Sequence, residues 1–357
     1  YEIIKCDWSS DVCSSDLLPG EAEPVSAALL AVPPRGSPSG WVVVVNATAG
    51  RRQGEALGAL IRDTVSAAGR QVSVRLVMHA DALETTTAAA AAHARALGAV
   101  LVGVGGDGTL NTVARAAMAA GVVFSAIPQG TFNYFGRCHG FPADPAEAVA
   151  AVLGGQVRPV QVGRLNGRIF LVNASLGIYP ELLQDREAYK ARFGRSRWVA
   201  FVAAGATLLR AQRRLRLHIE TGSAVRDVQT LTLFVGNNRL QLQQFGAEPE
   251  DTIAGTPGDG SMAALMLRPI GTLSMLKLML HGAMGRLGEA AGVESFEFKH
   301  MVVKPTLCTD HTELVVAFDG EVARMRAPID IRVLEKPLYL LQSTAEGGTA
   351  DAHKVTA

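Results

Sequence analysis

A glycine-rich turn holds the residues whose types and spacing could do chemistry. An apolar run at 100–104 breaks into Gly105-Gly106-Asp107-Gly108, and a helical pattern follows from Thr109. Glycines have no Cβ, so the backbone can approach an anion closely. A helix starting here, with Thr109 as its candidate cap, would point free N–H groups and a positive dipole end at that anion. Phosphates repel Asp107 unless a cation lies between them or Asp107 handles a proton, so the turn indicates phosphoryl chemistry with a metal.

Other uses of such a turn have different requirements. A glycine-rich turn can be a tight connection only. The spacing of Gly103, Gly105 and Gly108 also satisfies G-x-G-x-x-G, which predicts a dinucleotide fold with an acidic residue about 20 positions on. Here the next strand ends in Pro128-Gln129, so the ribose anchor of that fold is missing. The sequence G-x-x-x-x-G-K-[ST] does not occur, which argues against a P-loop enzyme.

The elements around the turn alternate between strand and helix patterns. Strands are expected at 41–45, 72–77, 100–105 and 122–127, with helices after each of the first three, which predicts a parallel sheet. A second small polar loop, Gly130-Thr131-Phe132-Asn133, follows the fourth strand, and ligands bind beyond the carboxyl ends of such strands. Asp144-Pro145-Ala146-Glu147 is typical of a helix start.

Alternating patterns then replace helical ones, which predicts a second, β-rich domain of sandwich type. An Asn166-Gly167 pair is a hairpin signal within it. The expected strands lie at 157–164, 168–174, 215–221, 228–235, 262–267, 296–303 and 314–318, with helical patterns near 181–213 and 272–286.

Composition limits the class of protein. A chain of 357 residues, 48% hydrophobic and 19% charged, is long enough for two ordinary cores. A net charge of +1 argues against a dominant nucleic-acid footprint. The four cysteines have no C-x-x-C spacing, so we expect a reducing, cytoplasmic setting. The longest apolar stretch, 198–209, is shorter than the roughly 20 residues of a spanning helix.

One segment has a strong local charge. Between Arg186 and Arg216 nine basic residues accompany one acid, Glu187, a balance of +8, with apolar residues such as Trp198 between them. Such a segment could lie on an anionic membrane surface, or it could be a solvated helix face that covers the second domain.

Several short motifs together resemble the catalytic domain of the diacylglycerol kinase family, in particular its bacterial soluble lipid kinases. The resemblance covers residues 41–341. It rests on the glycine-rich turn through Asn111, the loop at 130–133, and four further stretches: Asn46-Ala47-Thr48-Ala49-Gly50, Val235-Gly236-Asn237-Asn238, Gly258-Asp259-Gly260 and Phe318-Asp319-Gly320-Glu321.

The resemblance implies an NAD kinase/diacylglycerol kinase-like fold, with an N-terminal α/β Rossmann-like domain and a C-terminal β-sandwich domain. We expect a foreign leader at 1–40, the nucleotide-binding domain at 41–160 with a C-terminal return at 330–343, the lipid-substrate domain at 161–329 and a tail at 344–357.

The same resemblance implies site residues. Asp259 would bind Mg²⁺ together with backbone oxygens near Thr256 and Ser261. Glu321 would accept a proton, with Asp107 and Asp319 as rival catalytic carboxylates. The expected ATP-binding residues are Asn46, Ala47, Thr48, Ala49, Gly50, Gly105, Gly106, Asp107, Gly108, Thr109, Leu110, Asn111, Gly130, Thr131 and Asn133.

The implied function is an ATP- and Mg²⁺-dependent lipid kinase that transfers the γ-phosphate to a lipid hydroxyl, with diacylglycerol as the first expectation. Its partners would be nucleotide and a lipid at a membrane surface, without nucleic acid, and a homodimer is left open. An NAD kinase-like phosphotransferase and a non-catalytic nucleotide- or lipid-binding regulator are the alternatives.

Three positions depart from the family pattern. Ala47 stands where proline is usual, Tyr134 stands where many members have aspartate, and a frequent threonine is missing near Met78-His79. Tyr134 leaves the identity of the acceptor open. The stretch at 173–180 is similar to a branch that shares this variation. His139 is expected to be a loop histidine.

Overall fold

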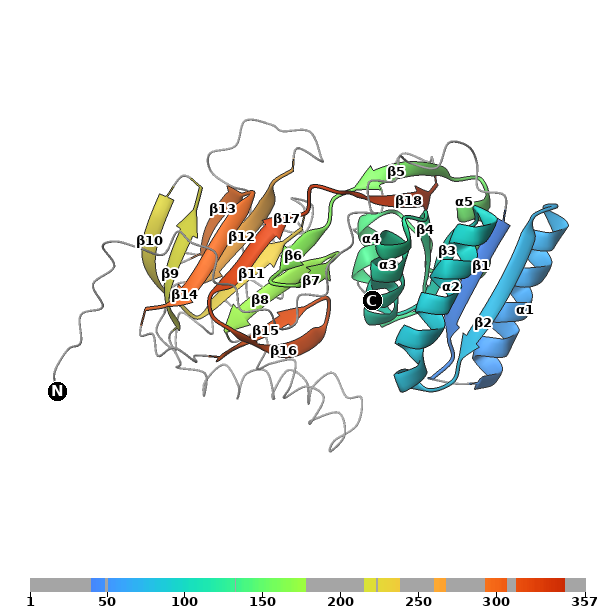
Figure 1. Cartoon of the computed structure of the whole chain (residues 1–357), viewed down its shortest axis with the longest axis horizontal. Coiled ribbons are helices and arrows are strands. Elements are labelled where there is room, and N and C mark those ends of the chain that lie inside the picture. The colour runs from blue at the N-terminus through green and yellow to red at the C-terminus, as the bar shows by residue number, and fades with distance from the viewer. Residues whose placement is uncertain are drawn as a thin grey trace, which may run out of the picture.

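A computed structural model describes residues 40–48, 51–131, 133–177, 215–222, 224–237, 260–267, 293–306 and 313–343. These residues form an α/β domain and a second domain of two packed sheets (Figure 1). The leader before Gly40, the tail, the basic segment up to residue 214 and the helical patterns near 181–213 and 272–286 lie outside the described residues.

The α/β domain is built on one six-stranded sheet. Its strands are β1 (Gly40–Asn46), β2 (Gln71–Val77), β3 (Val100–Gly105), β4 (Phe124–Pro128), β5 (Gln156–Val160) and β18 (Leu338–Gln342). Their order is β2-β1-β3-β4-β18-β5, and the first four are parallel. The carboxyl ends of β1, β3 and β4 therefore meet at one edge.

Helices cover both faces of this sheet, which is why the central strands are apolar on both sides. Their bounds are α1 (Arg51–Ala67), η2 (Ala80–Ala82), α2 (Leu83–Leu97), α3 (Asp107–Ala120), α4 (Tyr134–Cys138) and α5 (Pro145–Leu153). Helices α1 and α5 contact each other, as do α2 and α3. Trp41 and Val42 in β1 are both almost fully buried. The Asp144 cap is confirmed, since its carboxylate accepts the N–H groups of Ala146 and Glu147.

The second domain consists of two six-stranded sheets. One has the order β10-β9-β14-β17-β6-β7, and the other has the order β13-β12-β11-β8-β15-β16. Their bounds are β6 (Gly163–Leu165), β7 (Arg168–Phe170), β8 (Asn173–Gly177), β9 (Leu215–Thr221), β10 (Ala224–Thr230), β11 (Thr232–Gly236), β12 (Met262–Leu267), β13 (Val293–Phe298), β14 (His300–Pro305), β15 (Glu313–Phe318), β16 (Glu321–Arg326) and β17 (Ile329–Val333).

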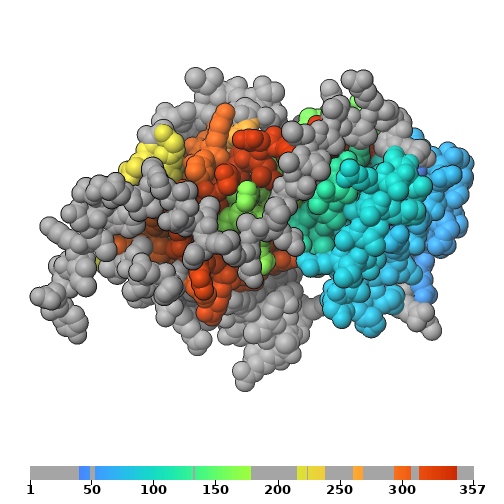
Figure 2. Space-filling view, viewed as in Figure 1, coloured from blue at the N-terminus to red at the C-terminus, as the bar shows by residue number. Residues whose placement is uncertain are grey.

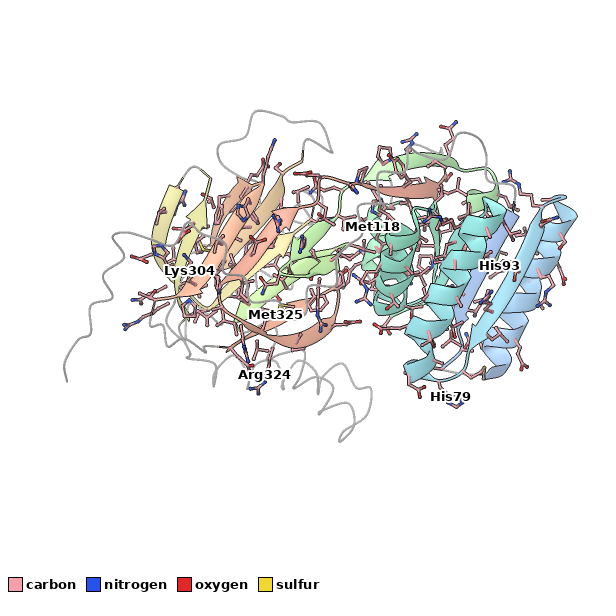
Figure 3. All side chains as sticks on the ribbon, in the orientation of Figure 1. His79, His93, Met118, Lys304, Arg324 and Met325 are labelled. Atoms are coloured by element: carbon pink, nitrogen blue, oxygen red, sulfur yellow. The ribbon has the colours of Figure 1, made fainter. Side chains whose placement is uncertain are left out.

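One apolar core lies between these two sheets. It takes Leu217 and Met301 from one sheet and Leu176 and Val316 from the other. In Figure 3 Arg324 is labelled at the lower side of β16, whereas its neighbour Met325 packs against the core. The predicted two-domain fold, α/β followed by a sandwich, is confirmed.

Four predicted strands are wrong as single elements. The stretch at 157–164 is divided between β5, in the first sheet, and β6, in the second domain. Likewise 168–174 spans β7 and β8, 228–235 spans β10 and β11, and 296–303 spans β13 and β14. In the first two of these stretches alternation could not reveal the break, because residues at the crossings, such as Val162 and Val172, are themselves buried against the first core.

The chain returns to the first sheet at its C-terminal end. Strand β18 pairs with β4 and β5, whereas β17 pairs with β6 and β14 in the second domain. The start of the expected return at 330–343 therefore belongs to the sandwich, and β18 is the strand that rejoins the first sheet. In Figure 2 the orange and red strands of the second domain lie on one side of the molecule and the blue and blue-green elements of the first domain lie on the other. No helix within the described ranges is long and apolar enough to cross a membrane.

Candidate active site

Side chains join the end of β1 to the first turn of α3. Asn46, the last residue of β1, donates from Nδ2 to Thr109 Oγ1 at 2.7 Å. Its Oδ1 accepts from Thr48, from the backbone N–H at 3.1 Å and from Oγ1 at 2.7 Å. These bonds hold the loop after β1 against the first turn of α3. Ala49 and Gly50, expected in the same loop, lie outside the described residues.

The expectation that Thr109 caps α3 is wrong. Gly106 is the N-cap, α3 begins at Asp107, and Thr109 lies buried in its first turn. From within the first turn of the helix, the Thr109 hydroxyl accepts the hydrogen bond from Asn46 instead of capping the helix. The N-terminal N–H groups of a helix have no partner within it, and no side chain caps this end. The turn thus presents open donors and a positive dipole end, which suits a phosphate.

The two polar loops touch each other through glycine. A Cβ added to Gly130 would lie 2.7 Å from the Cα of Gly106, closer than real Cβ atoms come to backbone. Gln129 N–H donates to the Gly105 carbonyl at 2.8 Å, and Gly130 N–H donates to Asn133 Oδ1 at 2.6 Å. Asn133 has φ +50°, a left-handed conformation that asparagine tolerates. Only glycine allows this approach, so the two loops form one surface.

Asp107 holds the second loop in place. Its carboxylate accepts the N–H of Tyr134 at 3.2 Å and that of Phe135 at 3.0 Å, at the start of α4. Tyr134, one of the three departures from the family pattern, thus takes part in this contact through its backbone N–H. Asp107 is half-buried between the two loops.

Asp319 is a buried carboxylate with four N–H donors. Asn111 Nδ2 donates to it at 2.6 Å, and the backbone N–H groups of Leu171, Val172 and Asn173 donate at 2.7, 2.8 and 3.1 Å. Burial raises the pKa of Asp319 to about 6, against the opposing effect of these hydrogen bonds. The carboxylate therefore stays ionised at neutral pH, while both of its oxygens are occupied.

The same turn positions Glu321. Asp319 and Gly320 have φ of +47° and +87° and connect β15 to β16, and Glu321 is the first residue of β16. A Cβ built on Gly108 would lie 3.5 Å from Glu321 Oε1. The structure therefore brings the exposed carboxylate of Glu321 to the open end of α3, in the first domain.

Only part of the expected metal set lies in the described residues. Asp259 and Thr256 lie outside them. The Ser261 carbonyl accepts from Gln161 Nε2 at 3.0 Å, and Ser261 Oγ lies 3.4 Å from Glu297 Oε2. In the described ranges no three His, Cys, Asp or Glu side chains gather as a metal-binding group would.

The remaining expected site residues are divided between core and loop. Ala47, which stands where the family usually has proline, is buried. It packs tightly on α1, since a Cβ added to Gly54 would overlap with the Ala47 side chain. Leu110 is fully buried and packs in the core of the first domain. Thr131 is exposed in the second loop.

Two amide side chains, the buried Asn237 and the half-buried Gln161, connect segments near the domain crossing, and sequence reasoning missed Gln161. Asn237 Nδ2 donates to the carbonyls of Gln161 and Leu171 at 2.8 and 2.9 Å, and its N–H donates to the Val172 carbonyl at 2.9 Å. These bonds tie the end of β11 to both crossing segments. Asn237 was within a recognised motif, but no periodicity singles out Gln161.

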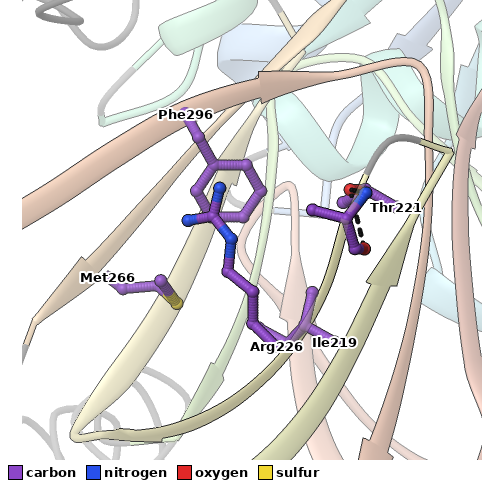
Figure 4. A pocket seen from close by; sticks show the side chains of 6 residues that line it. Ile219, Thr221, Arg226, Met266 and Phe296 are labelled. Carbon is purple, nitrogen blue, oxygen red and sulfur yellow. Dashed lines mark hydrogen bonds between the residues drawn. The ribbon is translucent and has the colours of Figure 1, made fainter.

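His139 and a small pocket lie apart from these contacts. His139 packs over the Phe135 ring with centroids 4.5 Å apart, and burial lowers its pKa to about 4, so it is neutral at physiological pH. A pocket of about 10 Å³ lies at the β10 and β13 edges of the sandwich (Figure 4), away from β7 and β16. It has room for about one water molecule, so it is too small for a nucleotide or a lipid.

Comparisons with known proteins identify relatives of this chain. The profile of a family described as Diacylglycerol kinase catalytic domain matches residues 40–165. A protein of Pseudomonas aeruginosa described as a probable YegS-like lipid kinase is 31% identical over 259 residues, which cover 71% of this chain and 79% of that protein. A diacylglycerol kinase of Bacillus subtilis strain 168 is 30% identical over 209 residues, or 54% of this chain and 65% of its own.

Solved structures share the fold. Two crystal structures of proteins from Bacillus anthracis str. Sterne, both described as diacylglycerol kinases, superpose with TM-scores of 0.66 and 0.60 at 19% and 16% identity. Each match covers 86% of this chain and 98% of the solved chain. The chain belongs to the diacylglycerol kinase catalytic family, in its bacterial, YegS-like lipid kinase branch.

Proposed function

We propose that this protein transfers the γ-phosphoryl group of ATP to the hydroxyl of diacylglycerol. The observation that carries the proposal is the position of Glu321 next to Gly108, because it puts a free carboxylate beside the open N-terminus of α3. A phosphate on that helix end would have a proton acceptor within reach, as phosphoryl transfer to an alcohol requires.

Each surrounding residue has a role in this proposal. The N–H groups of the glycine-rich turn and the loop at 130–133 bind the nucleotide phosphates. Asn46 and Thr109 fix the first loop against them, and Asp107 fixes the second. Asp319 positions Glu321, since its own oxygens are already occupied.

The proposed chemical step transfers one phosphoryl group from ATP to the lipid hydroxyl. The lipid hydroxyl oxygen bonds to the γ-phosphorus while the bond from that phosphorus to the β–γ bridging oxygen breaks. The hydroxyl proton passes to Glu321, and ADP leaves. Mg²⁺, held in this proposal by Asp259 and by backbone oxygens near Thr256 and Ser261, would offset charge on the phosphates. The carboxylate and carbonyl oxygens of that set are the ligands that Mg²⁺ prefers.

The choice of diacylglycerol as acceptor is supported by the B. subtilis relative, which is described as a diacylglycerol kinase. A lipid acceptor requires the protein to work at a membrane surface, so we also propose peripheral association with the membrane from the cytoplasm, with the basic segment at 186–216 as the docking element. Reversing the charge of Arg210, Arg213 and Arg214 should then abolish binding to anionic liposomes. Unchanged binding would exclude this segment as the docking element.

The test is a transfer assay with ATP labelled in its γ-phosphate and total lipid extract, with NAD in a parallel reaction. We expect label in one extracted lipid, identified as phosphorylated diacylglycerol. Label in water-soluble dinucleotide would instead identify an NAD kinase-like enzyme. ATP binding without any labelled product would identify a regulator.

A further inference from the structure

We propose that Arg168 is a further catalytic residue, whose guanidinium contacts the transferring phosphoryl group from the sandwich side. This inference rests on the proposed function, because it presumes a phosphoryl group between Glu321 and the first turn of α3. It assigns the site a protein cation that neither the motifs nor the expected ligand set contains.

The backbone of Arg168 is held next to α3. Arg168 begins β7, opposite Leu165 across the Asn166-Gly167 hairpin. The carbonyl of the next residue, Ile169, accepts from Asn111 Nδ2 at 3.3 Å. Asn111 lies one helical turn from Asp107, so the start of β7 is fixed beside the phosphate-binding end of the helix.

The side chain of Arg168 lies over Phe318. Its Cζ is 5.8 Å from the centroid of that ring. Phe318 is directly opposite Glu321 in the β15–β16 pair, so the guanidinium and the candidate base share one end of this hairpin. A ring below a guanidinium reduces its motion while leaving N–H groups at its edge for an anion. The side chain is exposed, so a ligand can reach it.

The charges at the site call for such a cation. The described acidic groups around the turn are Asp107, Glu321 and the buried Asp319, and an ATP phosphate would add further negative charge. Amides and hydroxyls from Asn46, Thr109 and the loops give directional donors but no positive charge. Arginine can donate two parallel hydrogen bonds to one phosphoryl group, which lysine cannot, and in phosphoryl transfer such an arginine acts mainly on the transition state.

The alternative is that Arg168 only packs on the Phe318 ring and has no role in the reaction. The chain offers a matched control for this alternative, because Arg226 lies over Phe296 with Cζ 5.4 Å from the ring centroid at the far edge of the sandwich (Figure 4). Arg226→Gln removes the same kind of contact without approaching the site.

The experiment compares Arg168→Gln, Arg168→Lys and Arg226→Gln with the wild type. For Arg168→Gln we expect kcat to fall by about 100-fold or more and KM for ATP to change by less than about fivefold. We expect the Kd for ADP and the Tm to stay near wild type, while the tight binding of ADP with aluminium fluoride, a mimic of the transferring group, is lost. Arg168→Lys should recover about tenfold in kcat, and Arg226→Gln should behave as wild type.

Two results would overturn the inference: kcat of Arg168→Gln within about threefold of wild type, or undiminished binding of ADP with aluminium fluoride. Parallel losses of Tm and ADP affinity would also overturn it, since they indicate a structural role. If the wild type transfers no phosphate to lipid, the proposed function fails, and the binding of ADP with aluminium fluoride then decides the role of Arg168 by itself.

Discussion

Asn111 Nδ2 donates to Asp319 Oδ2 at 2.6 Å across 208 positions of sequence. Asn111 is in α3, the helix that follows the glycine-rich turn, and Asp319 is in the turn that precedes Glu321. Together with the bond from the same amide to the Ile169 carbonyl, this buried bond ties the two domains together at the site. It also explains why an exposed hairpin glutamate can be placed against a helix of the other domain.

Removing the donor should loosen this connection. Asn111→Ala removes the donor to the buried Asp319 carboxylate and the donor to the Ile169 carbonyl, so we expect the free energy of unfolding to fall by about 1–3 kcal/mol, as measured by urea denaturation. We also expect kcat to fall, because Glu321 would no longer be held against Gly108. Thr112→Ala is the control, since it removes only the local bond from Thr112 Oγ1 to the Gly108 carbonyl. Equal effects of the two variants would contradict the role of Asn111.

The raised pKa of Asp319 predicts a pH dependence of stability. The unfolded chain has this group near its ordinary value of 3.8 and the folded chain has it at about 6, so between these values the folded state holds the extra proton. The stabilisation from this group is complete below about pH 4 and is lost as the pH rises through about 6.

Asp319→Asn removes this titration. Between pH 4 and pH 7 the unfolding free energy of the wild type should therefore fall by up to about 3 kcal/mol relative to that of Asp319→Asn. Denaturant titrations at several pH values measure it. A difference that does not vary with pH would show that the pKa of Asp319 is not raised by folding.

The backbone contact between the two loops predicts an intolerance to any Cβ. Gly130→Ala should separate Gly130 from Gly106 and disturb the phosphate surface, so we expect weaker ATP binding by about tenfold or more, measured by calorimetry, since small displacements in a site have large effects. Gly167→Ala is the matched control, because a Cβ there meets nothing within 4 Å. ATP affinity of Gly130→Ala equal to that of the control would rule out the second loop as part of the nucleotide site.

Local structure was well predicted from sequence, and longer-range placement was not. The strand-turn-helix at Gly105, the Asp144 cap and the sandwich all follow from short patterns of residue type. Thr109 was misassigned as a cap because its real partner, Asn46, is 63 residues away. Two of the divided strands were missed because crossing residues such as Val162 and Val172 are as buried as the strands they connect.

Individual roles at the site needed coordinates. Asp107, Asp319 and Glu321 are all carboxylates next to glycine, so their types cannot distinguish them. Their surroundings do: Asp107 accepts two N–H groups, Asp319 accepts four, and Glu321 faces Gly108. Arg168 had no sequence signal, since a hairpin arginine next to Asn166-Gly167 resembles any surface cation.

The central claim is that Glu321 accepts the proton of a lipid hydroxyl while phosphate is transferred. The most direct measurement follows label from the γ-phosphate of ATP into diacylglycerol in vesicles, for the wild type, Glu321→Gln and Glu313→Gln. Glu313 is an exposed glutamate at the other end of the same hairpin, opposite Arg326. We predict phosphorylated diacylglycerol from the wild type and Glu313→Gln, and a loss of about 100-fold or more for Glu321→Gln with ATP binding retained. Turnover by Glu321→Gln close to that of the wild type would contradict the account.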